Sequence, residues 1–117
     1  MKEQFISKLE EALFGYGFSK KDNNTYERIQ TLTQPGQVMI INGRQMKQPD
    51  QPVEVKHVVK EVGDGYISNM DDTNKVDLTT YEFLVYVNGR EQGAMSIAYR
   101  WDDVEDFKIN LSNIIQA

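Results

Sequence analysis

The chain has 117 residues, of which 39% are hydrophobic and 26% charged, values that are ordinary for one globular domain and argue against a disordered chain. It contains no cysteine, which excludes a disulfide framework, a thiolate metal site and a cysteine nucleophile. The net charge is −5, with no basic stripe to neutralise phosphates. No segment approaches the run of about 18 apolar residues that a membrane span requires. We therefore expect a single cytoplasmic domain over residues 1–117, with no direct nucleic-acid binding and no membrane contact.

The N-terminal segment has the pattern of an amphipathic helix over residues 3–16. Its apolar residues recur every three or four positions: Phe5, Ile6, Leu9, Ala12, Leu13 and Tyr16. Gly17 suits the left-handed residue that closes many helices, and Phe18 is then placed to fold back towards Leu13. Residues 19–24 are polar and predict a turn.

The next part of the chain predicts a strand, a short hairpin and a loop. Residues 25–33 have the β-branched and aromatic content of a strand. The apolar run 38–41 leads into Asn42-Gly43, a dipeptide typical of two-residue type I′ turns. Such a turn places Met39 opposite Met46 and Ile41 opposite Arg44. The stretch 48–52 contains two prolines and predicts a loop, the best candidate for a mobile excursion.

Residues 53–62 fit either a helix or a strand. Four valines have helical spacing: Val55, Val58, Val59 and Val62. Against a helix, the ten residues contain five valines, and β-branched side chains favour sheets because they lose rotamer freedom in helices. We interpret this stretch as a strand and the following Gly63-Asp64-Gly65 as the tip of another hairpin. Residues 70–75 then predict a polar loop before a strand that begins near Val76.

The strongest local signal is a hairpin over residues 79–99, where two apolar-rich runs flank Asn88-Gly89. A two-residue turn predicts four cross-strand pairs: Val87 with Arg90, Val85 with Gln92, Phe83 with Ala94 and Tyr81 with Ser96. This register places Tyr81, Phe83, Val85 and Val87 on one face and Leu84, Tyr86, Met95, Ile97 and Tyr99 on the other. Both faces are then apolar, so we expect the hairpin inside a sheet rather than at its rim.

Residues 103–116 predict a second amphipathic helix. Its apolar stripe consists of Val104, Phe107, Leu111, Ile114 and Ile115. Asp102 and Glu105 have the spacing of a capping box, and neighbouring acidic residues add negative charge at the helix N-terminus. Because short turns join successive strands, we predict an α+β fold. In it, an antiparallel meander of about five to six strands carries an N-terminal and a C-terminal amphipathic helix on one face.

Few residues carry reactive chemistry. His57 is the only histidine, so no His-His or Cys-His cluster exists, and a histidine in a valine-rich run is typical of a strand residue with a satisfied ring. The stretch 71–77 lacks the glycine and the final glutamate of an EF-hand loop, which leaves only adventitious cation binding. Helix capping accounts for the carboxylates at residues 102–106. We therefore expect no enzyme activity, no cofactor and no dedicated metal site.

Aromatic and methionine residues in the C-terminal half are of the types enriched in protein interfaces. The candidate protein-binding residues are Tyr81, Tyr86, Met95, Tyr99 and Trp101, for which packing between sheet and helices is the competing interpretation. The helix–meander–helix order resembles that of secretion-chaperone-like and other small adaptor domains.

The sequence thus favours a small acidic non-enzymatic adaptor or chaperone-like module, expected as a homodimer, that binds a protein partner through a sheet face or edge. The alternative is an acidic inhibitor, of the kind that phages and mobile elements encode, that blocks a basic nucleic-acid-binding surface. This alternative predicts that the carboxylates gather on one face of the fold.

Overall fold

A computed structural model of the protein describes residues 2–68 and 75–116. Along this part of the chain the elements are α1 (Lys2–Gly15), β1 (Ser19–Asp22), β2 (Thr25–Gln34), β3 (Val38–Ile41), β4 (Arg44–Lys47), β5 (Gln51–Ser68), β6 (Lys75–Val87), β7 (Arg90–Arg100) and α2 (Val104–Gln116). The predicted α+β class is confirmed, with a helix at each end and antiparallel strands between them. The loop predicted at residues 70–75 lies outside the described residues except for Lys75, which is the first residue of β6.

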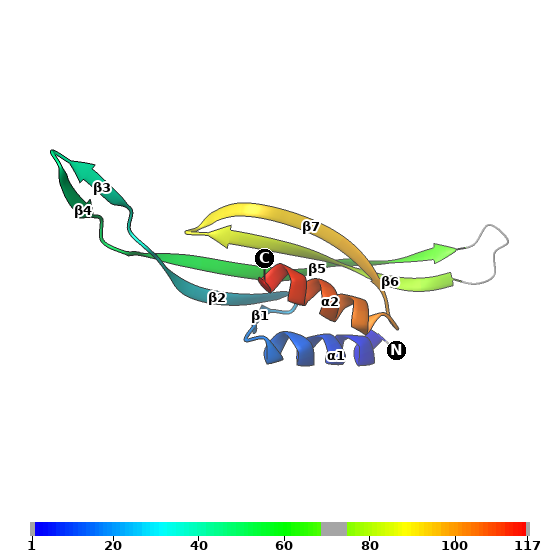
Figure 1. Cartoon of the computed structure of the whole chain (residues 1–117). Helices are drawn as coiled ribbons and strands as arrows, with labels where there is room; N and C mark the ends of the chain where they lie inside the picture. The colour runs from blue at the N-terminus through cyan, green and yellow to red at the C-terminus, as the bar shows by residue number, and fades with distance from the viewer. Residues whose placement is uncertain (1, 69–74, 117) are drawn as a thin grey trace.

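Five strands form one antiparallel sheet in the order β1-β2-β5-β6-β7, and β3 and β4 form a separate hairpin between β2 and β5. Both helices cover the same face of the five-stranded sheet and run side by side in the same direction (Figure 1). Their N-termini therefore lie at the same end of the helical layer. Acidic residues in both first turns, Glu3, Glu105 and Asp106, offset the two helix dipoles there.

The core lies between the two helices and the covered face of the sheet. Its side chains come from both helices, from the turn after α1 and from β2, β5, β6 and β7: Phe5, Leu9, Leu13, Phe18, Tyr26, Val59, Tyr81, Phe83, Tyr99, Phe107 and Leu111. Phe107 sits among three other rings, with its centroid 5.5 Å from Tyr81, 5.7 Å from Phe83 and 5.3 Å from Tyr99. Such tilted and edge-on pairs each add about 0.5–1.5 kcal/mol beyond area burial, so this aromatic cluster fixes α2 on the sheet.

The predicted end of α1 is confirmed. Gly17 has a φ of 92°, in the left-handed region that glycine adopts without strain. The Gly17 amide donates to the Phe14 carbonyl at 3.1 Å, and the Phe18 amide donates to the Leu13 carbonyl at 3.0 Å. These two bonds define a Schellman motif, and its apolar contact is supplied by the buried Phe18.

The β6–β7 hairpin departs from the predicted register after its first pairs. Asn88 and Gly89 form the predicted type I′ turn, with φ of 51° and 81°, and Val87 pairs with Arg90 as predicted. Gln92, however, has no partner in β6 and forms a β-bulge. The three predicted pairs beyond it are therefore wrong: Val85 pairs with Gly93, Phe83 with Met95 and Tyr81 with Ile97.

The bulge decides which face of the sheet is apolar. One extra residue transfers all later side chains to the opposite face, so Met95, Ile97 and Tyr99 lie on the helix-covered side with Tyr81 and Phe83. The uncovered side of the hairpin keeps mostly polar or small residues: Thr80, Glu82, Leu84, Tyr86, Ala94, Ser96 and Ala98. The expectation of two apolar faces is therefore wrong. The expected interior position is also wrong for β7, which lies at the rim of the sheet.

Two further predicted turns belong to strands. Residues 19–22 form β1, a wholly exposed edge strand that pairs with β2. Residues 53–62 are strand as interpreted, but Gly63-Asp64-Gly65 continues β5 instead of ending it. Val62 is unpaired there, between Glu61 opposite Tyr81 and Gly63 opposite Thr80. Glycine in a strand marks bulges as well as turns, and this segment is a bulge.

The molecule is strongly elongated, with extents of 76 × 28 × 21 Å and a radius of gyration of 19.9 Å. A compact domain of about this size has a radius of gyration of about 13 Å. The extra length comes from two projections at opposite ends of the sheet (Figure 1). One is the β3–β4 hairpin, and the other is the far end of the β5–β6 pair.

Candidate protein-binding surfaces

The five residues predicted to bind a partner are not brought together by the fold. Tyr81 and Tyr99 are each only 2% exposed and belong to the core. Burial raises the pKa of both hydroxyls, and the Tyr99 hydroxyl accepts a hydrogen bond from the Asn110 side chain at 2.9 Å. Trp101 is half-buried and donates from Nε1 to the Thr79 hydroxyl at 3.0 Å. These three side chains hold the helices to the sheet. This agrees with the alternative interpretation, in which they pack between sheet and helices instead of binding a partner.

The apolar side chains at the centre of the uncovered face are buried among their neighbours. Val58 and Leu84 lie opposite each other there and are buried. Tyr86 lies on the same face, with its ring centroid 5.2 Å from Lys56 Nζ. Lys56 also pairs with Glu27 at 3.2 Å. Of the predicted binding residues only Met95, 44% exposed at the rim of the covered face, is open to solvent.

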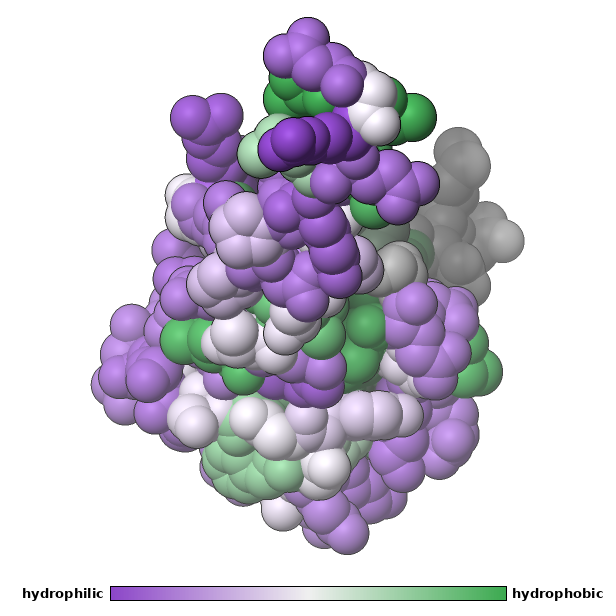
Figure 2. Space-filling view, turned by 60° about the vertical axis from the view of Figure 1, so that its left-hand side comes forward, coloured by the Kyte–Doolittle hydropathy of each residue, from purple (hydrophilic) through white to green (hydrophobic). Residues whose placement is uncertain are grey.

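The largest group of exposed apolar side chains lies on the β3–β4 hairpin, which we call the arm (residues 38–47). Every residue of both strands is exposed, with the apolar ones being Val38, Met39, Ile40, Ile41 and Met46. Ile40 reaches 73% exposure. Figure 2 shows the arm at the top of the view, where hydrophobic side chains stay at the surface beside strongly hydrophilic ones.

The geometry of the arm follows the sequence closely. Asn42 and Gly43 have φ of 53° and 76°, and the predicted pairs of Met39 with Met46 and Ile41 with Arg44 are both present. Apolar residues occur on both faces of the hairpin, with Met39, Ile41 and Met46 on one and Val38 and Ile40 on the other. In the sequence, the unbroken apolar run at residues 38–41 is the pattern that indicates apolar side chains on both faces of this hairpin. A strand of apolar residues without alternation exposes both faces unless a third element covers it.

The base of the arm is tightly held. The Gly36 amide donates to Asp50 Oδ1 at 2.8 Å, and the Gln48 amide donates to the Gln37 carbonyl at 2.9 Å. A Cβ at position 36 would lie 1.7 Å from the Gln48 carbonyl oxygen, so only glycine fits where the two chains cross. Residues 48–50 are loop as predicted, whereas Gln51 and Pro52 already belong to β5.

The arm is locally basic on an acidic molecule. No acidic residue occurs between Glu27 and Asp50, whereas Arg44 and Lys47 lie among the apolar residues of the arm. The nearest carboxylate is that of Asp50, 3.9 Å from Lys47 Nζ at the base. The arm thus combines exposed aliphatic side chains with two cations, although the whole chain carries a net charge of −5.

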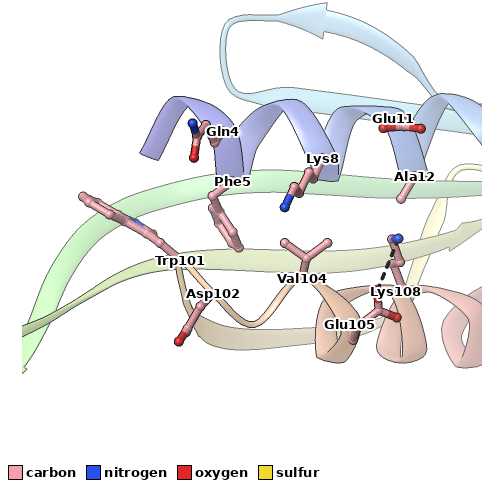
Figure 3. Close-up of a pocket in the computed structure, with 10 residues that line it drawn as sticks. All are labelled: Gln4, Phe5, Lys8, Glu11, Ala12, Trp101, Asp102, Val104, Glu105 and Lys108. Carbon is pink, nitrogen blue, oxygen red and sulfur yellow. Dashed lines mark hydrogen bonds and ion pairs between the residues drawn. The ribbon is translucent and has the colours of Figure 1, made fainter. Parts of the chain in front are cut away.

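A groove of about 770 Å³ runs between the two helices (Figure 3). Its walls are Gln4, Phe5, Lys8, Glu11 and Ala12 of α1, and Trp101, Asp102, Val104, Glu105 and Lys108 at the start of α2. Lys8 points from α1 towards α2, and Lys108 pairs with Glu105 at 3.5 Å. Charges of both signs alternate along the walls, so the groove does not favour one class of ligand.

The capping box predicted at Asp102 and Glu105 is not formed. Helix α2 begins one residue later than predicted, so that Asp103 occupies the N-cap position. Asp102 instead pairs with Arg100 at 3.5 Å across the turn that leaves β7, and Glu105 pairs with Lys108. The carboxylates of this segment thus take part in local ion pairs and complement the helix N-terminus.

His57 lies in β5 as predicted, but its ring is only partly satisfied. The side chain is buried, and Nδ1 has no hydrogen-bond partner among the residues that the structure describes. Burial lowers the pKa of His57, the neighbouring Arg28 lowers it further, and a hydrogen bond with the Ile114 backbone acts in the opposite direction. Within residues 2–68 and 75–116, no group of three or more His, Asp or Glu side chains could hold a metal ion.

Comparisons with protein-family models, with curated proteins and with solved structures found no match for this chain. Neither helix of the described residues is long and apolar enough to cross a membrane. The function must therefore be argued from the surfaces themselves.

Proposed function

We propose that this protein is a non-enzymatic protein-binding module whose main binding surface is the arm. The observation that carries the proposal is the exposure of five aliphatic and methionine side chains on a hairpin whose strands are exposed along their whole length. Exposed apolar groups that gather in this way mark interaction sites, whereas isolated ones are ordinary. Met and aliphatic side chains adapt well to the surface of a partner.

The arm is poorly suited to a purely structural role. It contributes no side chain to the core, and a hairpin of two short strands is at best marginally stable alone in water. Its joint with the body is nevertheless fixed by Gly36 and Asp50. An element that is held firmly at its base and unsupported along its length is typical of a segment that becomes ordered against a partner.

The composition of the arm indicates the chemistry of the partner. The apolar side chains on both faces of the arm would be buried in an apolar groove of the partner. Carboxylates at the rim of that groove would pair with Arg44 and Lys47. The partner is then a protein with an acidic, apolar cleft. Insertion of the arm into a lipid surface uses similar chemistry, and the experiment below separates the two.

The inhibitor alternative has less support. Cations lie within ion-pair distance of carboxylates on α1, β2, β5 and α2, in pairs such as Lys20–Glu10 at 3.2 Å and Lys56–Glu27 at 3.2 Å. Interleaved charges of both signs do not imitate the phosphate backbone of a nucleic acid.

The test is affinity capture from the lysate of the native host with the wild-type chain and with Ile40→Asn. Ile109 on α2 provides a matched control, because it is also exposed, at 57%, but lies away from the arm. We expect one protein to be retained by the wild type and by Ile109→Asn and to be lost, at least tenfold, with Ile40→Asn. Recovery of that protein with all three chains would contradict the proposal.

A second measurement tests whether the arm binds a lipid surface instead of a protein. Vesicles that contain anionic lipid are sedimented with the wild-type chain and with Ile40→Asn. We expect the wild type to stay in the supernatant. Co-sedimentation that Ile40→Asn abolishes would replace the protein partner by a membrane.

A further inference from the structure

Strand β7 is a long edge strand of the five-stranded sheet. It extends over 11 residues and pairs only with β6, so the outer side of its backbone carries amide and carbonyl groups that no other described strand satisfies. Natural proteins protect such edges with charges, prolines or covering elements. The charged residues of β7 lie only at its ends, as Arg90, Glu91 and Arg100. The central stretch 93–98 contains neither charge nor proline.

A second copy of the chain can pair with this edge only in certain registers. When two identical antiparallel strands are related by a two-fold axis perpendicular to the sheet, one residue must lie opposite its own copy, because directly opposed side chains share a face. If that residue is Ser96, Met95 faces Ile97 of the second copy and Ala94 faces Ala98. Gly93 then faces Tyr99, and Gln92 faces Arg100.

This register complements the side chains on both faces. Met95 is 44% exposed and Ile97 only partly buried, and both lie on the helix-covered face. Met95 of each copy would contact Ile97 of the other copy. These two contacts would cover the rim of the core. On the opposite face, small exposed side chains at 94, 96 and 98 leave the two backbones free to approach.

The neighbouring registers fit less well. Centring on Met95 places Met95 opposite its own copy and Gly93 opposite Ile97, so neither Met–Ile contact forms. Centring on Ala94 carries the pairing across the bulge at Gln92 into residues 90 and 91 and loses the Met–Ile contacts, and centring on Ile97 pairs only residues 94–100. We infer that β7 is a self-pairing edge that joins two copies of this chain about Ser96 into a continuous sheet. This inference gives the homodimer expected from the sequence a defined interface that is separate from the arm.

Cysteine crosslinking tests this register directly, since the chain contains no cysteine. Directly opposed residues have Cα atoms about 4.5–5.5 Å apart, within the range of about 4.4–6.8 Å that a disulfide bridges. We therefore expect oxidised Ser96→Cys to become a covalent dimer. Ala94→Cys is the control, because its two copies lie four residues apart along the strands, about 13 Å, and should stay unlinked.

The mass in solution tests the interface without a crosslink. The wild-type chain is expected at twice its monomer mass of 13.5 kDa over a range of concentrations. Met95→Lys should return it to 13.5 kDa with an unchanged circular dichroism spectrum, because Met95 is half-exposed in the single chain. The control Ile109→Lys should remain dimeric.

Three outcomes would overturn the inference: a wild-type monomer at high concentration, equal crosslinking of Ser96→Cys and Ala94→Cys, or crosslinking at Met95→Cys in place of Ser96→Cys. The variant Ile40→Asn distinguishes partner binding by the arm from self-association through β7. This variant should lose the protein partner and keep the dimer, whereas conversion to a monomer by Ile40→Asn would assign self-association to the arm instead.

Discussion

Asn42 and Asn88 occupy the same position in two type I′ turns, but their side chains differ in what they hold. The Asn88 side-chain oxygen accepts a hydrogen bond from the Glu54 amide at 2.9 Å, and the Asn88 amide donates to the Glu54 carbonyl at 2.8 Å. The turn of the β6–β7 hairpin is thereby joined to β5. In the described structure the side chain of Asn42 forms no hydrogen bond to a neighbouring strand, and its turn is the tip of the arm.

His57 is a buried residue whose ionisation couples stability to pH. Its pKa lies below the ordinary value of 6.5 in the folded chain, because burial and Arg28 disfavour the charged ring. In the unfolded chain the ring regains its ordinary pKa and binds protons more readily. Lowering the pH through 6.5 therefore favours unfolding, and the stability that the neutral ring permits is present above pH 6.5.

We predict that the wild-type melting temperature falls between pH 7 and pH 5, and that His57→Gln shows a flatter dependence over the same interval. His57 is the only histidine, so no other imidazole contributes to the slope. The comparison uses the slope and not the absolute stability, since the substitution itself alters a packed site. Equal slopes for both chains would mean that His57 does not change its protonation on unfolding.

At the scale of elements, the bulge at Gln92 decides where the core-facing residues of β7 point. The chain from Gly93 to Arg100 keeps an unbroken register with β6, and only Gln92 stands outside it. Deleting Gln92 would join Glu91, opposite Tyr86, directly to Gly93, opposite Val85, and would restore a regular hairpin with the same residues in the core.

We therefore predict that deletion of Gln92 changes the free energy of unfolding by less than about 1 kcal/mol, as for a surface substitution. Deletion of Ala98 is the contrasting variant. It removes an exposed alanine but forces either the loss of pairing or the transfer of Ile97 or Tyr99 to the uncovered face. Transfer of one large aliphatic side chain alone costs about 1.5–3 kcal/mol. Urea denaturation measures both, and equal destabilisation by the two deletions would contradict this account of the bulge.

The same elements show how much of the fold the sequence could predict. Periodicity and capping chemistry are local, and they predicted both helices, the Gly17 terminus and both Asn-Gly turns correctly. A bulge leaves only a weak local mark: Gly93 inside a strand is compatible with a bulge, but it does not specify that Gln92 is unpaired. The energy that selects the bulge is the burial of Ile97 and Tyr99 beneath α2, which is a tertiary effect.

That single residue also accounts for the burial of two of the predicted binding residues. With the regular register, Tyr81 and Tyr99 lie on opposite faces and one of them needs a partner. With the bulge both enter the core, and the uncovered face becomes polar. The arm was predicted correctly as a hairpin, but its exposure depends on the absence of a third strand beside it, which short-range patterns do not report.

At the scale of the whole molecule, the arm should be separable from the fold. It adds length without adding to the core, and Gln34 at the end of β2 lies directly opposite Gln51 at the start of β5. A two-residue turn between these positions would therefore close an ordinary β2–β5 hairpin.

We predict that replacing residues 35–50 by Asn-Gly leaves the melting temperature unchanged or raises it, because the loop between the strands becomes shorter and no buried side chain is lost. The radius of gyration of the shortened dimer should be smaller than that of the wild-type dimer, and the mass should remain twice that of the shortened chain, since β7 is untouched. Small-angle scattering with light scattering measures both, and thermal unfolding measures the stability. We expect the shortened chain to fold, to stay dimeric and to lose the partner. This result would assign partner binding to the arm, self-association to the β7 edge and stability to the core. A shortened chain that fails to fold would show that the arm stabilises the sheet.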